Sequence, residues 1–338
     1  MDYAIVWFVF WAVLWTGYFA LDGFDLGVGY SGWLAAETPE ERGRVFASIG
    51  PFWDGNEVWL ITAGGATFAA FPPVYASLFS WLYPALFLLL FCLIFRGVAL
   101  EFRGKVADPA WKTAWERTAA VSSFLAALLL GVAFGNIFRG LEIGPSGYVG
   151  TFLGLLNPYG ILTGLLFCAM FLYHGQLWIA SRVEGAPAER ALELAKKSWL
   201  ALMILYCVYA GVSYTREGLY SHAAFRLAVS ALTLLLVSWS RGLLQKGRPA
   251  CAFHASFAFI AALAAGGFAR IYPALLPSRI DPSYSLTIFN SASSPYTLKL
   301  MTIVVVVFLP VVIGYQVWVH RVFRSPLTPA ELKKSGMY

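Results

Sequence analysis

The chain has 338 residues and a formal net charge of +6, with 59% hydrophobic and only 12% charged residues. Ordinary soluble domains carry about 25% charged residues. This composition and a mean hydropathy of +0.68 therefore exclude an ordinary soluble domain and indicate repeated membrane crossings. The basic residues fall in short runs between apolar spans, which argues against a nucleic-acid partner. The four cysteines form no CxxC pair, so neither a disulfide framework nor a zinc site is predicted.

Windows of about 20 apolar residues predict nine transmembrane helices in one all-α membrane domain, residues 1–322, followed by a cytoplasmic tail, residues 323–338. In chain order the predicted spans are Ala4–Gly29, Phe52–Phe71, Ser77–Val98, Thr118–Phe138, Tyr159–Ile179, Trp199–Val212, Ala223–Trp239, Phe253–Tyr272 and Leu300–Val319. The first span lacks a basic segment before it and a cleavage site after it. We therefore predict a retained helix and not a signal peptide.

Glycines and prolines predict how these helices pack and bend. Two pairs of glycines with four-residue spacing predict close helix contacts: Gly23 with Gly27, and Gly160 with Gly164. Pro84 and Pro310 fall inside the third and ninth predicted spans. A proline inside a helix removes a hydrogen bond, so both spans are predicted to be kinked.

The distribution of basic residues predicts the orientation of the chain. If the N-terminus lies outside, six of the 24 lysines and arginines fall in segments on the outer side of the membrane and 18 fall in segments on the cytoplasmic side. The outer residues are Arg139, Arg216, Arg226, Arg270, Arg279 and Lys299. Because basic residues collect on the cytoplasmic side of a membrane, the N-terminus is predicted to lie outside and the C-terminus inside.

Two acidic pairs lie inside the first two predicted spans. Asp22 and Asp25 are three residues apart, as are Asp54 and Glu57, so each pair is predicted to share a helix face. With the N-terminus outside, both pairs lie at a similar depth toward the inner face. A charge at mid-bilayer costs about 3 kcal/mol on insertion scales, and we therefore interpret the four carboxylates as part of a route for protons or cations.

A less specific interpretation stays open for each pair. Asp22 and Asp25 could lie at a frayed helix end and face the headgroups. Asp54 and Glu57 could be first-turn carboxylates that complement the helix dipole. The apolar stretch after the first pair and its glycine neighbours favour burial against protein.

Neighbouring side chains predict a packed polar pocket around the second pair. Trp53, Asn56 and Trp59 surround it in the sequence, and Arg96 at the inner end of the third span is a candidate counter-ion. Arg96 could equally be a plain inner-side anchor. His174 could be an axial heme ligand or a relay member, although a lone membrane histidine is more often hydrogen-bonded within its helix bundle.

Several long motifs resemble subunit II of cytochrome bd quinol oxidases. They are Leu21–Gly29 (LDGFDLGVG), Gly50–Ala66 (GPFWDGNEVWLITAGGA), Phe95–Arg103, Gly131–Asn136, Asn157–Gly160, and the stretches around Tyr272–Ser278 and Met301–Pro310. The resemblance extends from about residue 2 to about residue 323. The first two motifs are long and unusual, which makes the resemblance specific.

This resemblance implies a fold and a reaction. The fold would be two four-helix bundles, about 4–138 and about 159–272, with a peripheral ninth helix at about 300–319. Subunit I would hold the b-type hemes, heme d and the quinol site, and this chain would ligate no heme. The complex would oxidise quinol, reduce oxygen to water and build a proton gradient in a bacterial or archaeal cytoplasmic membrane.

The resemblance also implies roles for particular residues. The aspartate that belongs to the family's proton route falls at Asp54, and Asp22 and Asp25 match its other acidic motif. Glu57 is a glutamine in some members, so its role is less fixed. A structural quinone on this chain and a small accessory single-helix subunit remain open.

Two other functions are compatible with the residues alone. One is a secondary transporter or ion channel that uses the four carboxylates as a cation site. The other is a purely structural partner that only stabilises the heme-bearing subunit.

Overall fold

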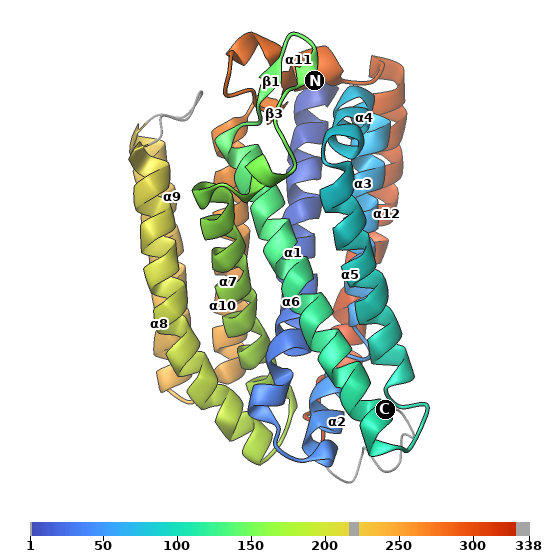
Figure 1. Ribbon diagram of the computed structural model, residues 1–338, viewed down its shortest axis with the longest axis vertical. Coiled ribbons are helices and arrows are strands. Elements are labelled where there is room, and N and C mark those ends of the chain that lie inside the picture. Colours follow the sequence, from blue (N-terminus) through green and yellow to red (C-terminus); the bar gives the residue numbers. More distant parts are fainter. Residues whose placement is uncertain (1, 216–222, 329–338) are drawn as a thin grey trace.

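The computed structural model describes residues 2–215 and 223–328, and it is dominated by long helices (Figure 1). The long helices are α1 (Tyr3–Ala35), α3 (Trp53–Ala70), α5 (Tyr83–Phe102), α6 (Pro109–Arg139), α7 (Pro158–Arg182), α8 (Ala186–Thr215), α9 (Ala223–Gln245), α10 (Pro249–Ile271) and α12 (Pro295–Val322). Arg216, His222 and most of the predicted tail lie outside the described residues.

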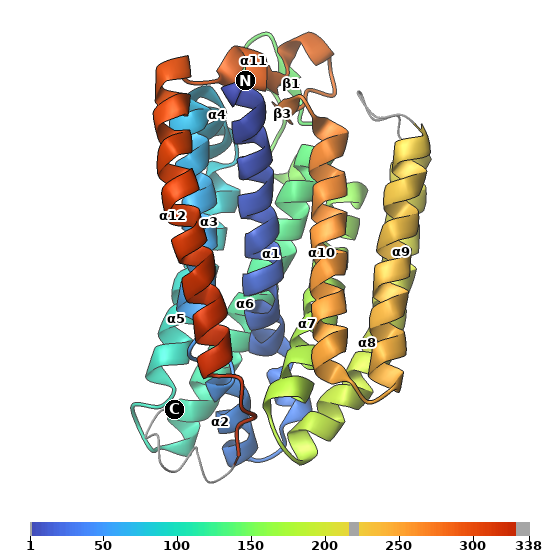
Figure 2. The same ribbon diagram turned by 180° about the vertical axis from the view of Figure 1, so that it is seen from behind.

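Seven of these helices in the described part of the chain are long and apolar enough to cross a membrane: α1, α5, α6, α7, α9, α10 and α12. The chain is therefore a multi-pass membrane protein. α3 and α8 correspond to the second and sixth predicted spans, and Figures 1 and 2 show both running alongside the other long helices. The nine-span count and the orientation in the membrane stay predictions.

Helix α1 lies at the centre of the arrangement. It packs against α3 and α6 on one side and against α7 and α10 on the other, while α5 packs on α6 and α8 packs on α7. α12 contacts α1 and α3 from outside and buries none of its most apolar stretch (Figure 2). Trp7 of α1 fixes this outer helix, because its indole donates to the carbonyl of Leu298 at 3.0 Å and meets the Thr302 hydroxyl.

Glycines allow the central helices to meet backbone to backbone. A Cβ added at Gly27 would lie 1.9 Å from the carbonyl oxygen of Phe171, and one at Gly175 would lie 2.6 Å from Gly27. A Cβ at Gly131 of α6 would lie 2.6 Å from Gly164 of α7. The close contacts predicted for both glycine pairs are confirmed. Gly27 and Gly164 meet the backbone of the neighbouring helix, whereas Gly23 packs on the Phe171 ring and Gly160 on the Asn136 side chain.

The third predicted span is interrupted where the sequence predicted a kink. Instead of one helix over 77–98, α4 (Pro72–Trp81) ends before α5 begins, and Pro84 occupies the first turn of α5. The kink prediction for Pro84 was wrong because proline is tolerated in a first turn, where its missing N–H has no partner to lose. Pro310 does lie inside α12.

Short elements cover the two ends of the helices. At one end lie the hairpin of β1 (Ile143–Gly144) with β2 (Gly147–Tyr148), the pair β3 (Ala274–Leu276) with β4 (Leu286–Thr287), and α11 (Ile288–Ser291). At the other end lies α2 (Pro39–Ala47), which begins with a capping box at Thr38. The N-terminus lies at the first of these ends (Figure 1).

We predict that Gly27→Ala prevents normal packing of α1 on α7. The added methyl group overlaps a backbone carbonyl that cannot move independently of its helix, so the cost should be about 3 kcal/mol or more. The measurement is the apparent Tm and the yield of monodisperse protein purified from membranes.

Gly211→Ala is the matched control. It lies in α8, and no atom stands within 4 Å of the position of its Cβ. Alanine is the better helix former, so this variant should be at least as stable as the wild type. Equal stability of both variants would contradict the proposed backbone contact.

Candidate functional site

A buried ion-pair cluster joins α1, α3 and α5. The Arg96 guanidinium donates to Asp22 Oδ1 and to Glu57 Oε2, each at 2.7 Å. Arg96 is 1% exposed and Asp22 is fully buried, while the Glu57 side chain keeps 21% of its surface exposed. Arg96 is therefore a counter-ion inside the protein and not an anchor at the membrane surface.

Asp25 lies next to this cluster and binds a different partner. The Asn56 side-chain amide donates to Asp25 Oδ2 at 2.7 Å and to the carbonyl of Leu21 at 3.3 Å. Both Asp25 and Asn56 are buried. Asp22 and Asp25 lie well before the end of α1 at Ala35, so the interpretation of this pair as a frayed helix end is wrong.

Asp54 does not join the other acids. Although it lies only three residues before Glu57, it is exposed and faces a cavity of about 520 Å³ between α3, α5 and α12. Gln316 of α12 and Glu101 of α5 also line this cavity. The prediction that Asp54 and Glu57 occupy one polar pocket is wrong. Residues three apart on an α-helix point about 60° away from each other, and here this angle is enough for the two side chains to face different neighbours.

The two tryptophans predicted around the site fill space between helices. The Trp53 ring packs on Gly97 of α5, where an added Cβ would lie 3.4 Å away. The Trp59 ring packs on Gly17 of α1, where an added Cβ would lie 2.7 Å away. Both rings fix the position of α3 against its neighbours, which holds Asn56 and Glu57 toward α1 and α5.

His174 connects three helices through both of its ring nitrogens. Nε2 lies 3.1 Å from the carbonyl oxygen of Ala20 and Nδ1 lies 2.5 Å from the Ser256 hydroxyl. The ring stacks on Phe253 at a centroid distance of 4.3 Å. A carbonyl only accepts hydrogen bonds, so Nε2 carries the proton. With both nitrogens in use, His174 offers no axial position to a heme iron, and the hydrogen-bonded interpretation fits.

Three further residues lie near the carboxylates and were not singled out from the sequence. On the same face of α1, Tyr18 lies one turn before Asp22 and Trp15 lies two turns before it. The Tyr18 hydroxyl and the Trp15 indole nitrogen are both buried in the protein interior. Glu101 shares the cavity of Asp54. The helical spacing along α1 could have identified the first two, whereas Glu101 required knowledge of which helices are neighbours.

We predict that Arg96→Gln destabilises the protein by about 3–5 kcal/mol, because it leaves the buried Asp22 and the partly exposed Glu57 without a positive partner. The measurement is the apparent Tm of the purified protein and its yield from membranes.

The double variant Asp22→Asn with Arg96→Gln provides the control for this prediction. It removes one charge of each sign and keeps the side-chain volumes, so it should recover a large part of the lost stability. If the double variant is as unstable as Arg96→Gln alone, the ion pair is not the cause of the loss.

Comparisons with known proteins agree with this architecture. Residues 3–323 match the family described as cytochrome bd terminal oxidase subunit II. The chain is 33% identical over 328 residues to the cytochrome bd ubiquinol oxidase subunit 2 of Bacillus subtilis (strain 168), covering 96% of this chain and 97% of that relative. It is 30% identical over 374 residues to the cytochrome bd-I ubiquinol oxidase subunit 2 of Escherichia coli (strain K12), covering 99% and 98%.

A solved structure supports the fold independently. A chain of the bd oxidase from Geobacillus thermodenitrificans superposes with a TM-score of 0.77 at 17% sequence identity, covering 96% of this chain and 99% of that one. The matches in sequence and in fold both extend over almost the whole length of the chain. The chain therefore belongs to the cytochrome bd terminal oxidase subunit II family.

Proposed function

We propose that this chain is the non-heme subunit of a bd-type terminal quinol oxidase and that it serves two purposes. It holds the heme-bearing subunit I in place, and it carries protons from the cytoplasm toward the oxygen-reducing site of that subunit. Family membership supports the first part. The carboxylate cluster around Arg96 is the observation that carries the second.

The charges of the cluster support a proton-holding role. Three carboxylates (Asp22, Asp25 and Glu57) lie near a single guanidinium. Among the described residues, Arg96 bonds to Asp22 and Glu57, whereas Asp25 accepts a hydrogen bond from the neutral amide of Asn56. One positive charge cannot neutralise three negative ones in a medium of low dielectric constant. Binding a proton lowers the net charge that is buried, so the cluster can take up a proton and release it again.

Buried polar atoms without protein partners support a relay through water. The atoms Asp22 Oδ2, Asp25 Oδ1, Asn56 Oδ1, Arg96 Nε and Trp15 Nε1 make no hydrogen bond to the described protein groups. Buried polar groups of this kind are where proteins hold ordered water. Water bound to these atoms would connect the carboxylates along one face of α1.

In this proposal Asp54 is the entry point of the proton route. It lies one helical turn before Glu57 on α3 and opens into the cavity that it shares with Glu101. With the N-terminus outside, this cavity faces the cytoplasm. Protons would be collected at Asp54, pass to Glu57 and reach the Asp22 and Asp25 region.

The reaction of the complex requires such a supply. Two quinol molecules release four electrons and four protons at the outer side, and one oxygen molecule takes up four electrons and four protons to form two water molecules. If the protons consumed come from the inside, turnover builds a proton gradient without pumping. The b-type hemes and heme d of subunit I supply the electron transfer, and this chain supplies the proton path.

The wider arrangement belongs to the same proposal. We place the N-terminus outside and the C-terminus inside, with α1, α3, α5 and α6 as one bundle, α7 to α10 as a second, and α12 at the periphery. The complex would lie in a bacterial cytoplasmic membrane, and a small accessory subunit would pack on the exposed helices.

A structural quinone also has a candidate location on this chain. A mostly apolar cavity of about 750 Å³ lies between α1, α3 and α12, lined by Trp7, Phe10, Val58 and Phe308 among others. Its mostly apolar lining suits an isoprenoid tail, and Thr62 and Gln316 would supply polar contacts for a ring.

We predict that Asp54→Asn slows oxygen reduction by at least about tenfold while assembly and heme content stay near wild type. Asp54 is exposed, and no hydrogen bond of its carboxylate is found among the described residues, so the substitution leaves the fold unchanged. The measurement is quinol-driven oxygen uptake per heme in the purified complex.

Glu40→Gln is the matched control. It also removes an exposed carboxylate at the same end of the molecule, in the first turn of α2, away from the cavity. Its activity should equal that of the wild type. Full activity of Asp54→Asn would leave a purely structural role for this chain.

A copurification experiment distinguishes the proposed oxidase subunit from a secondary transporter. The tagged chain is purified with its partner, and the reduced-minus-oxidised spectrum and oxygen uptake are recorded. Bands of b- and d-type heme that appear with the partner and vanish without it support the proposal. A stable heme-free chain with no oxidase activity in any fraction would favour a secondary transporter.

A further inference from the structure

A polar stripe on one face of α1 extends beyond the carboxylate cluster. Tyr18 lies four residues before Asp22, and Trp15 lies three residues before Tyr18, so all three share one side of the helix. Tyr18 is 1% exposed and Asp22 is fully buried. The Trp15 and Tyr18 rings meet edge to face with their centres 6.3 Å apart. Three side chains with polar tips therefore follow one another inside the protein.

The polar atoms of this stripe have unused hydrogen-bonding capacity. The Tyr18 and Asp22 side chains affect each other electrostatically, yet neither Tyr18 Oη nor Asp22 Oδ2 makes a hydrogen bond of ordinary length to a described protein group. Trp15 Nε1 is likewise buried without an acceptor among the described residues. Phenylalanine would fill the position of Tyr18 without burying a hydroxyl, so packing alone does not explain this residue.

The stripe has a defined end on the side of the N-terminus. One turn before Trp15, the Trp11 indole donates to the Thr67 hydroxyl at 2.9 Å, so its nitrogen is satisfied by the protein. Among the described residues of α1, the buried polar atoms with unused capacity therefore form one group that extends from Asp25 to Trp15.

The chemistry of the three side chains suits the transfer of a proton. A tyrosine hydroxyl both donates and accepts hydrogen bonds, whereas an indole N–H only donates and an ionised carboxylate only accepts. A water molecule that accepts from Trp15 Nε1 keeps another lone pair for the Tyr18 hydroxyl hydrogen. In the order Asp22, Tyr18 and water, a proton can be received from one neighbour and passed to the next.

We propose that Tyr18 is the relay that takes protons from Asp22, an inference that rests on the proposed function of this chain. A proton on Asp22 Oδ2 moves to a lone pair of Tyr18 Oη while the hydroxyl hydrogen leaves for the water held at Trp15. One O–H bond breaks and one forms at each transfer. Asp22 returns to a carboxylate, the tyrosine stays neutral, and the water carries the proton onward. The route thus leaves the Arg96 cluster toward the N-terminal half of α1.

The test is Tyr18→Phe in the complex purified with its partner. Loss of the hydroxyl should lower quinol-driven oxygen uptake per heme by at least about tenfold, while the heme bands stay unchanged. The ratio of the rates in ordinary and heavy water should rise, because proton delivery becomes the slow step. The apparent Tm should equal or exceed that of the wild type, because the variant removes a buried hydroxyl without a partner among the described groups.

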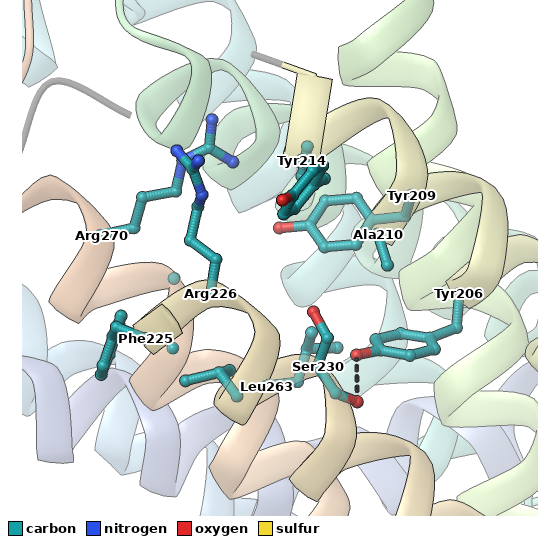
Figure 3. A pocket seen from close by; sticks show the side chains of 13 residues that line it. Tyr206, Tyr209, Ala210, Tyr214, Phe225, Arg226, Ser230, Leu263 and Arg270 are labelled. Carbon is teal, nitrogen blue, oxygen red and sulfur yellow. Dashed lines mark hydrogen bonds between the residues drawn. The ribbon is translucent and has the colours of Figure 1, made fainter. Parts of the chain in front are cut away.

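Tyr206→Phe is the matched control. Tyr206 of α8 is 2% exposed, and its hydroxyl donates to the carbonyl of Ser230 at 3.3 Å beside a small cavity (Figure 3). This variant should therefore lose stability and keep the activity and the isotope ratio of the wild type. The two buried tyrosines are expected to give opposite results, because one hydroxyl serves the rate and the other serves the fold.

Comparison with Asp54→Asn separates this inference from the proposed function. If Asp54→Asn is slow and Tyr18→Phe has the wild-type rate, the role of Tyr18 is overturned and the proposed route stands. Wild-type rates in both variants would overturn the route as well. A slow Tyr18→Phe variant with an unchanged isotope ratio and a lowered Tm would indicate a structural role and would also overturn the relay.

Trp15→Phe covers the case in which Tyr18→Phe does not assemble. It removes the indole N–H that orients the water and keeps an aromatic ring beside Phe134, whose ring centre lies 4.8 Å from that of Trp15. A slower rate with a raised isotope ratio supports the relay. The wild-type rate and ratio in this variant would contradict it.

Discussion

Arg96 places a full positive charge where little water can reach it, and Asp22 and Glu57 keep it there by direct bonds. Replacing a whole buried ion cluster with apolar residues is often harmless, whereas removing one member is expensive. The cluster therefore does little for overall stability but fixes the relative positions of α1, α3 and α5. Asn56, Asp25 and the glycine contacts of Trp53 and Trp59 all depend on that arrangement.

α1 connects this cluster to the second half of the chain. One of its faces carries the two buried aspartates, and the other carries Gly27 in contact with α7 and the Ala20 carbonyl bonded to His174. A displacement of α7 or α10 would therefore move the carboxylates as well. The packing of the two halves and the geometry of the acidic site are parts of one mechanical unit.

Much of this organisation was predictable from the sequence because apolar length and small-residue spacing are local properties. The membrane class, most of the spans and the glycine contacts follow from such patterns. For Arg96 the sequence left open whether it is a counter-ion of the acids or a plain inner-side anchor. The direction in which each acidic side chain faces cannot be predicted from these local patterns. Asp54 and Glu57 lie about 60° apart around a helix, and the sequence alone does not say which neighbour fills each direction. Glu101 was missed for the same reason, and the break before Pro84 depends on a first turn that span windows do not detect.

The separation of Asp22 from Arg96 along the chain has a consequence for biosynthesis. The two residues are 74 positions apart, so α1 leaves the ribosome long before its counter-ion exists. An unpaired carboxylate inside the bilayer costs about 3 kcal/mol, which the apolar remainder of α1 can offset. Until α5 is made, Asp22 therefore lies in the newly made helix without its positive partner. The Asp22–Arg96 bond that positions α1 against α5 can thus form only after α5 has been translated.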